Sequence, residues 1–192
     1  FDWTLGWQGK GQFWVAQQDP FDGDSGIEAG NNEEDFGRNP FSNPTIANLT
    51  LVGQADGDSK NRGIILRRGT RGQLSNTLIT NFANHGLEVS DEQTLTNLTD
   101  GTLSIRSVNA FDNARVATQE GKNIVNEVLL DPVLSNRTER LIVLQEGFKG
   151  IVTETITVID PRDEDPWFLS APYLGAVDPD QDWPLGWAQP LR

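Results

Sequence analysis

Short runs of alternating apolar and polar residues follow one another along the chain as far as Phe111, and turn-forming residues separate them. Alternation with a period of two is the pattern of a β-strand that buries one face. It predicts seven strands, over Gln12–Gln18, Gly26–Ala29, Pro44–Gly53, Gly63–Leu66, Leu74–Phe82, Gly86–Val89 and Thr102–Phe111.

These strands form two repeating series. The longer one is TIANLTLVG at 45–53, QLSNTLITN at 73–81, 28 residues later, and TLSIRSVNA at 102–110, after a further 29. The shorter one is GIEA, GIIL and GLEV, and the stretch Arg62–Asp91 holds its last two members. A period of 20–30 residues is typical of a solenoid whose coils share one core. It predicts Ile46 stacked on Leu74, and Asn48 on Asn76 in an amide pair at a coil corner.

The predicted fold is therefore an all-β, right-handed parallel β-helix. The length of 192 residues fits a single domain, 1–192, with coils over about 8–113. Residues 115–160 depart from the repeat and are expected to form an insertion or a decorated coil. A strand over Gly150–Ile159 and a short helix near Asn126–Leu134, limited by Pro132, are expected there. Residues 161–192 are expected to form an irregular capping tail rich in Trp and Pro.

Composition excludes several classes of function. The chain has no Cys, so disulfides, thiolate metal sites and Cys nucleophiles are absent. A formal charge of −13 opposes binding to nucleic acid and to anionic lipid. No apolar run approaches the length of a membrane span. Because the chain starts at Phe1 without Met, we expect a processed product or a segment of a longer protein.

Residues suited to catalysis are few. His85 is the only histidine, and its neighbours Asn84 and Gly86 predict a structural or surface role in a turn at a coil corner. No G-x-S-x-G elbow is present. Carboxylate pairs such as Glu88 with Asp91, or Asp24 with Glu28, are expected by chance in so acidic a chain. The sequence therefore favours a non-enzymatic protein.

Arginines and tryptophans supply the candidate ligand-binding residues: Arg62, Arg67, Arg68, Arg71, Trp3 and Trp7. The arginines either pair with carboxylates on adjacent coils or form a groove for an anionic sugar or another carboxylate. DWTLGW at 2–7 is repeated as DWPLGW at 182–187. These tryptophans either cover the ends of the core or serve as platforms for sugar rings.

An acidic loop over Asp19–Asp35 is the candidate metal site, with Asp22, Asp24, Glu28, Glu33 and Asp35 as oxygen ligands for calcium. The loop is not an EF-hand, because Ile27 stands where the sharp turn of that motif needs Gly. The alternative is a solvated loop. No cofactor is firmly implied, and calcium is the candidate.

The order DWTLGWQGKGQFWVAQQ, D-x-G-I-E-A-x-N, NPTIANLTLVG, GIILRRGTRGQLSNTLITNF and GLEV, with YLGAV and DWPLGW near the end, resembles one group of proteins. They are secreted or surface-associated bacterial right-handed parallel β-helix proteins, often described as hypothetical proteins or lipoproteins. The resemblance covers residues 1–113 and 172–187, and the group has no common activity to transfer. Its members carry further coils before the position of Phe1. If the chain is complete, its N-terminal coil is exposed, which implies a protein partner or self-association there.

Three functions are compatible with these features. The first is a non-enzymatic structural or interaction module, secreted or on the surface of a bacterium, or periplasmic, that docks other chains or copies of itself through an open β-helix end. The second is a polysaccharide-binding or polysaccharide-active β-helix. The third is a calcium-dependent adhesin-like module that uses Asp19–Asp35 and Asp178–Asp182.

Overall fold

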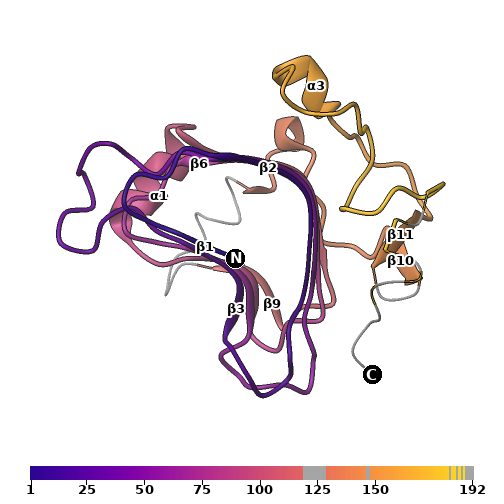
Figure 1. Ribbon diagram of the computed structural model, residues 1–192. Coiled ribbons are helices and arrows are strands. Elements are labelled where there is room, and N and C mark those ends of the chain that lie inside the picture. Colours follow the sequence, from indigo (N-terminus) through magenta and orange to yellow (C-terminus); the bar gives the residue numbers. More distant parts are fainter. Residues whose placement is uncertain (119–128, 146–147, 182, 185, 187, 189–192) are drawn as a thin grey trace.

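The computed structural model describes residues 1–118, 129–145, 148–181, 183, 184, 186 and 188. Its body is a solenoid made of two parallel sheets (Figure 1). The five-stranded sheet has the order β1 (Asp2–Trp3), β3 (Ser25–Ala29), β5 (Arg62–Leu66), β7 (His85–Val89), β9 (Arg115–Thr118). The four-stranded sheet has the order β2 (Lys10–Gln17), β4 (Thr45–Val52), β6 (Gly72–Thr80), β8 (Leu103–Phe111). The prediction of an all-β, parallel β-helix is confirmed.

The register of the coils follows the sequence repeat. Ile46 lies opposite Leu74, as predicted, and Leu74 lies opposite Ile105 in the next coil. In the other sheet, Ile27, Ile64 and Leu87 form a second column. All these side chains are buried in one cluster, so stacked like residues form a continuous core between the two sheets.

A glycine is the second residue of each of the short strands β3, β5 and β7, because the coils approach one another closely at this position. A Cβ on Gly63 would lie 2.4 Å from the carbonyl oxygen of Gly86 and 2.4 Å from Ile79 Cγ2. A Cβ on Gly26 would lie 2.8 Å from the carbonyl oxygen of Gly63. Only residues without a side chain fit these positions, which explains the repeated Gly-apolar-x-apolar pattern.

The long strands bend at one residue per coil that has a left-handed backbone. These residues are Phe13, Asn48, Asn76 and Ser107, with φ of 63°, 56°, 52° and 54°. The paired residues on either side of each show that the four occupy equivalent positions in successive coils. Asn48 and Asn76 are therefore stacked at a corner as predicted, and asparagine suits a left-handed residue.

One helix, α1 (Glu92–Thr99), lies beside the coils and was not predicted. Asp91 caps its N-terminus by accepting a hydrogen bond from the Thr94 N–H (2.9 Å). Asn97 fastens the helix to the solenoid through its Nδ2, which donates to the Gly69 and Thr70 carbonyls. Asp91 with Thr94, just before Leu95 and Leu98, was the available signal for this helix.

The described residues from Leu129 to Val152 lie at the end and side of the solenoid. A 3-10 turn, η1 (Pro132–Leu134), is followed by an antiparallel hairpin of β10 (Ile142–Gln145) and β11 (Lys149–Val152). The predicted helix near Asn126–Leu134 lies partly outside the described residues, and Pro132–Leu134 forms only the 3-10 turn.

The predicted strand over Gly150–Ile159 is wrong beyond Val152. Its pairing with β10 ends at the pair Ile142–Val152, just before the Thr153 N–H donates to the Leu141 carbonyl. Among the described residues, no strand pairs with the chain from Thr153 to Ile159. Ile159 instead bonds the side chain of Asn76, which donates to the Ile159 carbonyl and accepts from its N–H. Alternation alone therefore predicted a strand for which the described part of the chain supplies no pairing partner.

The segment from Ile159 to Val177, the C-terminal segment, runs along the bend of the long strands. It contains α3 (Pro161–Glu164). Its buried apolar residues are Phe168, Ala171, Leu174, Ala176 and Val177. Asn48 Nδ2 donates to the Ala171 and Tyr173 carbonyls at 3.1 and 2.8 Å. The stacked asparagines thus fasten this segment to the solenoid instead of bonding each other.

Candidate functional site

The outer face of the short-stranded sheet carries some of the charged residues that the sequence singled out. Asp2, Glu28, Ile65 and Glu88 occupy one column in successive coils. Their neighbours Ile27, Ile64 and Leu87 point into the core, so the alternation of a strand puts this column on the outside.

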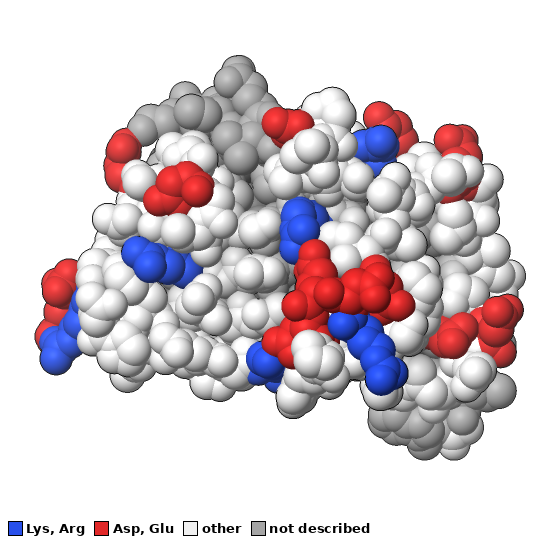
Figure 2. Space-filling view, turned by 90° about the horizontal axis from the view of Figure 1, so that it is seen from above, with Lys and Arg blue, Asp and Glu red and all other residues white. Residues whose placement is uncertain are grey.

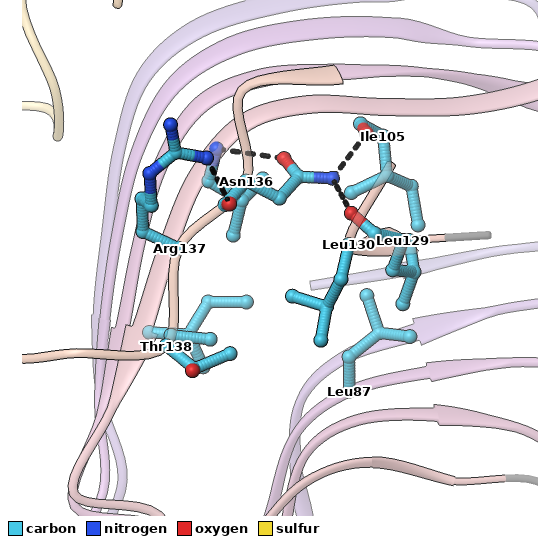
Figure 3. A pocket seen from close by; sticks show the side chains of 10 residues that line it. Leu87, Ile105, Leu129, Leu130, Asn136, Arg137 and Thr138 are labelled. Atoms are coloured by element: carbon cyan, nitrogen blue, oxygen red, sulfur yellow. Dashed lines mark hydrogen bonds between the residues drawn. The ribbon is translucent and has the colours of Figure 1, made fainter. Parts of the chain in front are cut away.

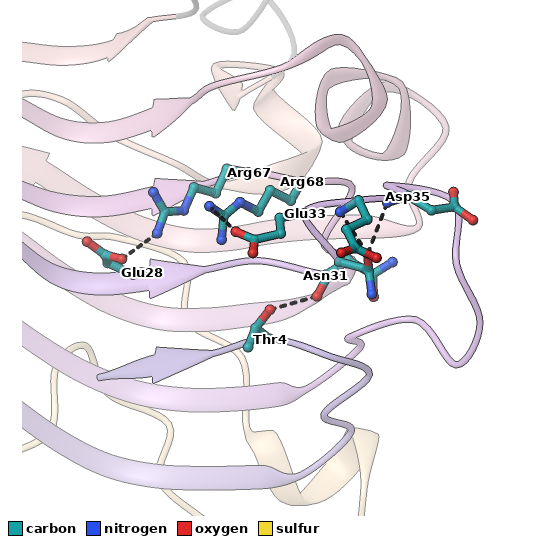
Figure 4. Close-up of polar contacts among 9 residues, drawn as sticks. Thr4, Glu28, Asn31, Glu33, Asp35, Arg67 and Arg68 are labelled. Carbon is teal, nitrogen blue, oxygen red and sulfur yellow. Dashed lines mark hydrogen bonds and ion pairs between the residues drawn. The ribbon is translucent and has the colours of Figure 1, made fainter.

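Three of the four candidate arginines pair with carboxylates. Arg67 Nη2 lies 2.5 Å from Glu28 Oε2 and Arg62 Nε lies 2.5 Å from Glu88 Oε2, each pair joining two neighbouring coils. Arg68 Nη2 lies 2.9 Å from Glu33 Oε2 (Figure 4). These arginines therefore already have anionic partners within the chain.

Arg71 lies apart from these pairs. Its guanidinium carbon sits 3.5 Å from the centre of the Phe41 ring, in a cation–π arrangement. Its Nε is buried and makes no hydrogen bond with a described group. The four arginines do not converge on one groove.

His85 starts β7 and is buried, so the prediction that it occupies a turn is wrong. The cause is strand pairing: His85 lies opposite Arg115, and neighbouring Asn84 bonds both Asn61 and Arg115 through its backbone. His85 Nδ1 lies 3.3 Å from Glu88 Oε2, as a close contact without good hydrogen-bond alignment. The imidazole, followed by Arg62, lowers the pKa of Glu88 against the opposing effect of burial.

Glu28 and Asp24 form the one candidate acid pair that the fold brings together. Burial is the main cause that raises the pKa of Glu28, and a side-chain hydrogen bond with Asp24 adds to it, while Arg67 opposes both. The other pair, Glu88 with Asp91, does not form such a site, because Asp91 caps α1 and accepts from the Arg68 N–H (2.5 Å). The net effect is a pKa of Glu28 above its ordinary value, although Arg67 pairs with this carboxylate.

The predicted calcium ligands have separate partners and do not gather around one point. Glu33 pairs with Arg68, and Asp35 Oδ1 accepts a hydrogen bond from the Gly37 N–H (3.0 Å). Asp22 is exposed. Within the part of the chain that the structure describes, no three His, Asp or Glu side chains gather in a way that would hold a metal. Calcium binding stays a prediction, and it would require the Glu28 and Glu33 ion pairs to open.

Aromatic side chains cover the N-terminal end of the core. Trp3 is 5% exposed, and its Nε1 donates to Thr70 Oγ1 (3.2 Å). Trp7 stacks on Trp14 at 6.4 Å between ring centres, and Phe1 stacks on Trp14 at 4.4 Å. The arrangement of Trp3 and Trp7 is that of a cover on the core, which is one of the two alternatives for these residues. The repeat DWPLGW cannot be compared with it, because Asp182, Leu185 and Trp187 lie outside the described residues.

The apolar surface at this end is only partly covered. Trp7 is 37% exposed, Phe1 48% and Leu5 71%. The strands at this end, β1 and β2, are the edge strands of their sheets. The sequence analysis did not select Trp14, although Phe1 and Trp7 both stack on it. The alternation of the strand gave the available signal, because it puts Trp14 on the side that faces the core.

At the opposite end, the second half of β8 is covered. Leu129, Leu130, Asn136, Arg137 and Thr138 lie over the last coil and leave a cavity of about 30 Å³ (Figure 3). That volume suits a single water and not a sugar. Asn136 fixes this cover, because its Nδ2 donates to the Ile105 and Leu129 carbonyls, both at 2.8 Å.

The C-terminal segment adds further ion pairs on the long-stranded sheet. Lys10 pairs with Asp165, and Arg106 Nη2 lies 2.8 Å from Glu164 Oε1.

Figure 2 shows the molecule from above, turned by 90° from the view of Figure 1. On this face, acidic and basic side chains adjoin one another and leave no wide area of one sign. This face offers no strongly charged patch for a polyanion.

Comparison with protein families gives one match, in which a model for the pectate-lyase-like β-helix domain covers residues 1–155. Comparison with curated proteins and with solved structures gave no match. Among the described residues, no helix is long and apolar enough to cross a membrane.

Proposed function

The chain belongs to the family of pectate-lyase-like β-helix domains, and from this premise we propose that it is a non-enzymatic interaction module that docks another protein chain through the N-terminal end of its solenoid. We place this module outside the bacterial cell or on its surface. Self-association through the same end is the simplest form of this docking.

The observation that carries the proposal is that β2 is an edge strand whose residues are only half-buried. This eight-residue strand pairs with β4 on one side and is the edge of its sheet on the other. Every residue from Gln12 to Gln17 is half-buried, whereas the equivalent residues of β4 are buried. A long edge strand with apolar residues is a template for a further strand.

The adjoining apolar surface supports the same function. Phe1, Leu5 and Trp7 lie exposed beside β1, next to the half-buried Trp14. Aromatic residues clustered at one end and rimmed by polar residues are typical of protein interfaces.

Polysaccharide binding or turnover is the second candidate. The description of the family and the acid pair Glu28–Asp24 favour it. The pairing of Arg62, Arg67 and Arg68 with carboxylates argues against an acidic sugar, because a ligand would have to displace those partners. A neutral polymer is the class that this surface fits better.

Light scattering coupled to size-exclusion chromatography tests the docking proposal. We expect mass to rise with protein concentration in the micromolar range. The strand-blocking variant is Val15→Pro. The Thr45 N–H donates to the Gly9 carbonyl and the Gln18 N–H donates to the Val52 carbonyl. Because alternate residues of a strand face opposite sides, the Val15 N–H points away from β4, and proline removes it from the open edge. Val15→Thr keeps that N–H and serves as the control.

We expect Val15→Pro to remain monomeric and Val15→Thr to associate like the unmodified chain. A chain that stays monomeric at all concentrations would contradict docking by self-association. Turnover of a neutral polysaccharide that Glu28→Gln abolishes would support the second candidate instead.

A further inference from the structure

At the other end of the long-stranded sheet, the described part of the chain leaves the first half of the edge strand β8 unpaired on one side. β8 is the edge strand there, and its second half is covered: Asn109 forms a parallel bridge with Arg137, and the Val108 N–H donates to Asn136 Oδ1 (3.0 Å). Among the described residues, no strand pairs with its first half, Leu103 to Arg106.

The backbone groups of this half-strand have a defined direction. The Gly72 N–H donates to the Thr102 carbonyl, so Thr102 and Ser104 face β6. The Ile105 carbonyl accepts from Asn136 Nδ2 on the opposite side. Because alternate residues of a strand present their backbone groups to opposite sides, the N–H and C=O of Leu103 and the N–H of Ile105 face away from β6. One guest residue placed beside Ser104 can therefore donate to Leu103 and accept from Ile105.

A groove of about 560 Å³ lies along this edge. Its apolar lining comes from three elements: Leu98 of α1, Leu103 and Ile105 of β8, and Val133 and Leu134 of η1. Val133 is 83% exposed, so its side chain can contact a ligand in the groove. The groove therefore combines open backbone groups with apolar contacts.

The charged residues that line the groove have one sign, and Arg71 lies close enough to Asp100 to contribute to lowering its pKa. Asp100 and Asp131 line it, at the C-terminus of α1 and at the N-cap of η1. The last turn of α1 has no basic residue, so its terminal carbonyls add partial negative charge at the same place. Hydrogen bonds from Thr102 lower the pKa of Asp100, which keeps it ionised. A cationic ligand complements this rim.

We infer that the groove between α1, β8 and η1 binds an extended basic peptide, which adds as a short parallel strand to Leu103–Ile105 and places apolar side chains between Leu98 and Val133. Lysine or arginine side chains flank these apolar residues and face Asp100 and Asp131. The groove lies at the opposite end of the sheet from β2, so it is a second docking surface that is independent of the first.

Fluorescence anisotropy with a labelled, end-blocked heptapeptide of alternating lysine and valine tests the inference. We expect saturable binding by the 192-residue chain. A peptide with glutamate in place of lysine should bind at least about tenfold more weakly, because it meets carboxylates of its own sign. A lysine peptide N-methylated on its central residue should lose about tenfold, because it lacks the hydrogen bond to Leu103.

The matched protein variant is Asp100→Asn combined with Asp131→Asn. Asn keeps a side-chain oxygen at both positions, which can accept from the Thr102 N–H (2.9 Å) and from the Val133 N–H (2.9 Å), so the turn after α1 and the N-cap of η1 survive. This variant should bind the lysine peptide about tenfold more weakly and no longer distinguish it from the glutamate peptide. Val15→Pro, at the far edge, should bind it like the unmodified chain.

Absence of saturation up to about 1 mM lysine peptide would overturn the inference. So would equal binding of the lysine and glutamate peptides by the unmodified chain. Loss of binding in Val15→Pro, with the Asp100/Asp131 variant unaffected, would assign the peptide to β2 and would also overturn it.

Discussion

Asn48 and Asn76 lie in the same position of successive coils, both with a left-handed backbone, and each holds the C-terminal segment by its side-chain amide. The pair therefore has two tasks. It turns the long strands, and it binds residues that are distant in the sequence. The fold of the solenoid and the position of the segment from Ile159 to Tyr173 depend on the same side chains.

Replacing Asn76 by alanine should cost about 2–3 kcal/mol of unfolding free energy. Alanine is strained at a φ of 52°, and the hydrogen bonds to Ile159 and Ala171 are lost. Asn76→Gly relieves the strain but not the lost bonds, so it should fall between alanine and the unmodified chain. Urea denaturation measures all three, and equal stability of Asn76→Ala and the unmodified chain would contradict the role of the pair.

Gly63→Ala should destabilise the solenoid by about 2 kcal/mol or more. The new Cβ would meet the Gly86 carbonyl and Ile79 Cγ2 at 2.4 Å, and backbone cannot yield as a flexible side chain can. Gly37→Ala is the control, because its Cβ has only Asp35 Oδ1 nearby, at 3.4 Å. A thermal melt that shows the two variants to be equally stable would contradict the close stacking of the coils.

Glu88 should make stability depend on acidity. Its pKa is lowered in the folded chain, so the folded state binds fewer protons than the unfolded state, and the stabilisation is present above the ordinary value of 4.5. It is lost as the pH falls through the folded pKa. Denaturation at pH 3–6 should show a shallower loss for Glu88→Gln than for the unmodified chain, and Glu34→Gln, at an exposed position, should follow the unmodified chain.

Glu28 should act in the opposite direction. Its raised pKa means that the folded state binds more protons than the unfolded state, so stability falls as the pH rises from 4.5 through the folded pKa. In the same titration, Glu28→Gln should remove this decline. If Glu28→Gln instead removes stabilisation throughout that range, the ion pair with Arg67 outweighs burial.

The calcium hypothesis has a direct thermal test. If the loop Asp19–Asp35 binds calcium, the melting temperature rises with calcium, and Asp24→Asn reduces the rise. Magnesium at the same concentration is the control for ionic strength, because it disfavours an irregular oxygen site. An unchanged melting temperature in millimolar calcium would dismiss the site.

The repeats made the coils predictable, because the like residues Ile46 and Leu74 occupy the same position in each. Residues 129–160 could not be placed in the same way, since Asn136 and Ile159 bind groups that no local pattern identifies. The ion pairs were predictable only as a class. Arg62 had many acidic residues available, and the stacking of β5 on β7 selects Glu88.

His85 shows a different limit. Its neighbours Asn84 and Gly86 have the composition of a turn, yet Gly86 serves close packing between coils, and the strand begins at His85 itself. A glycine required by packing and a glycine required by a turn look alike in a sequence.

Amide hydrogen exchange tests most directly the claim that β2 is the docking edge. We predict that the β2 segment, Lys10–Gln17, exchanges readily in dilute protein and becomes protected as concentration rises, while β4 stays protected throughout. Association that leaves β2 exchange unchanged, or protection that appears only at β8, would contradict the account.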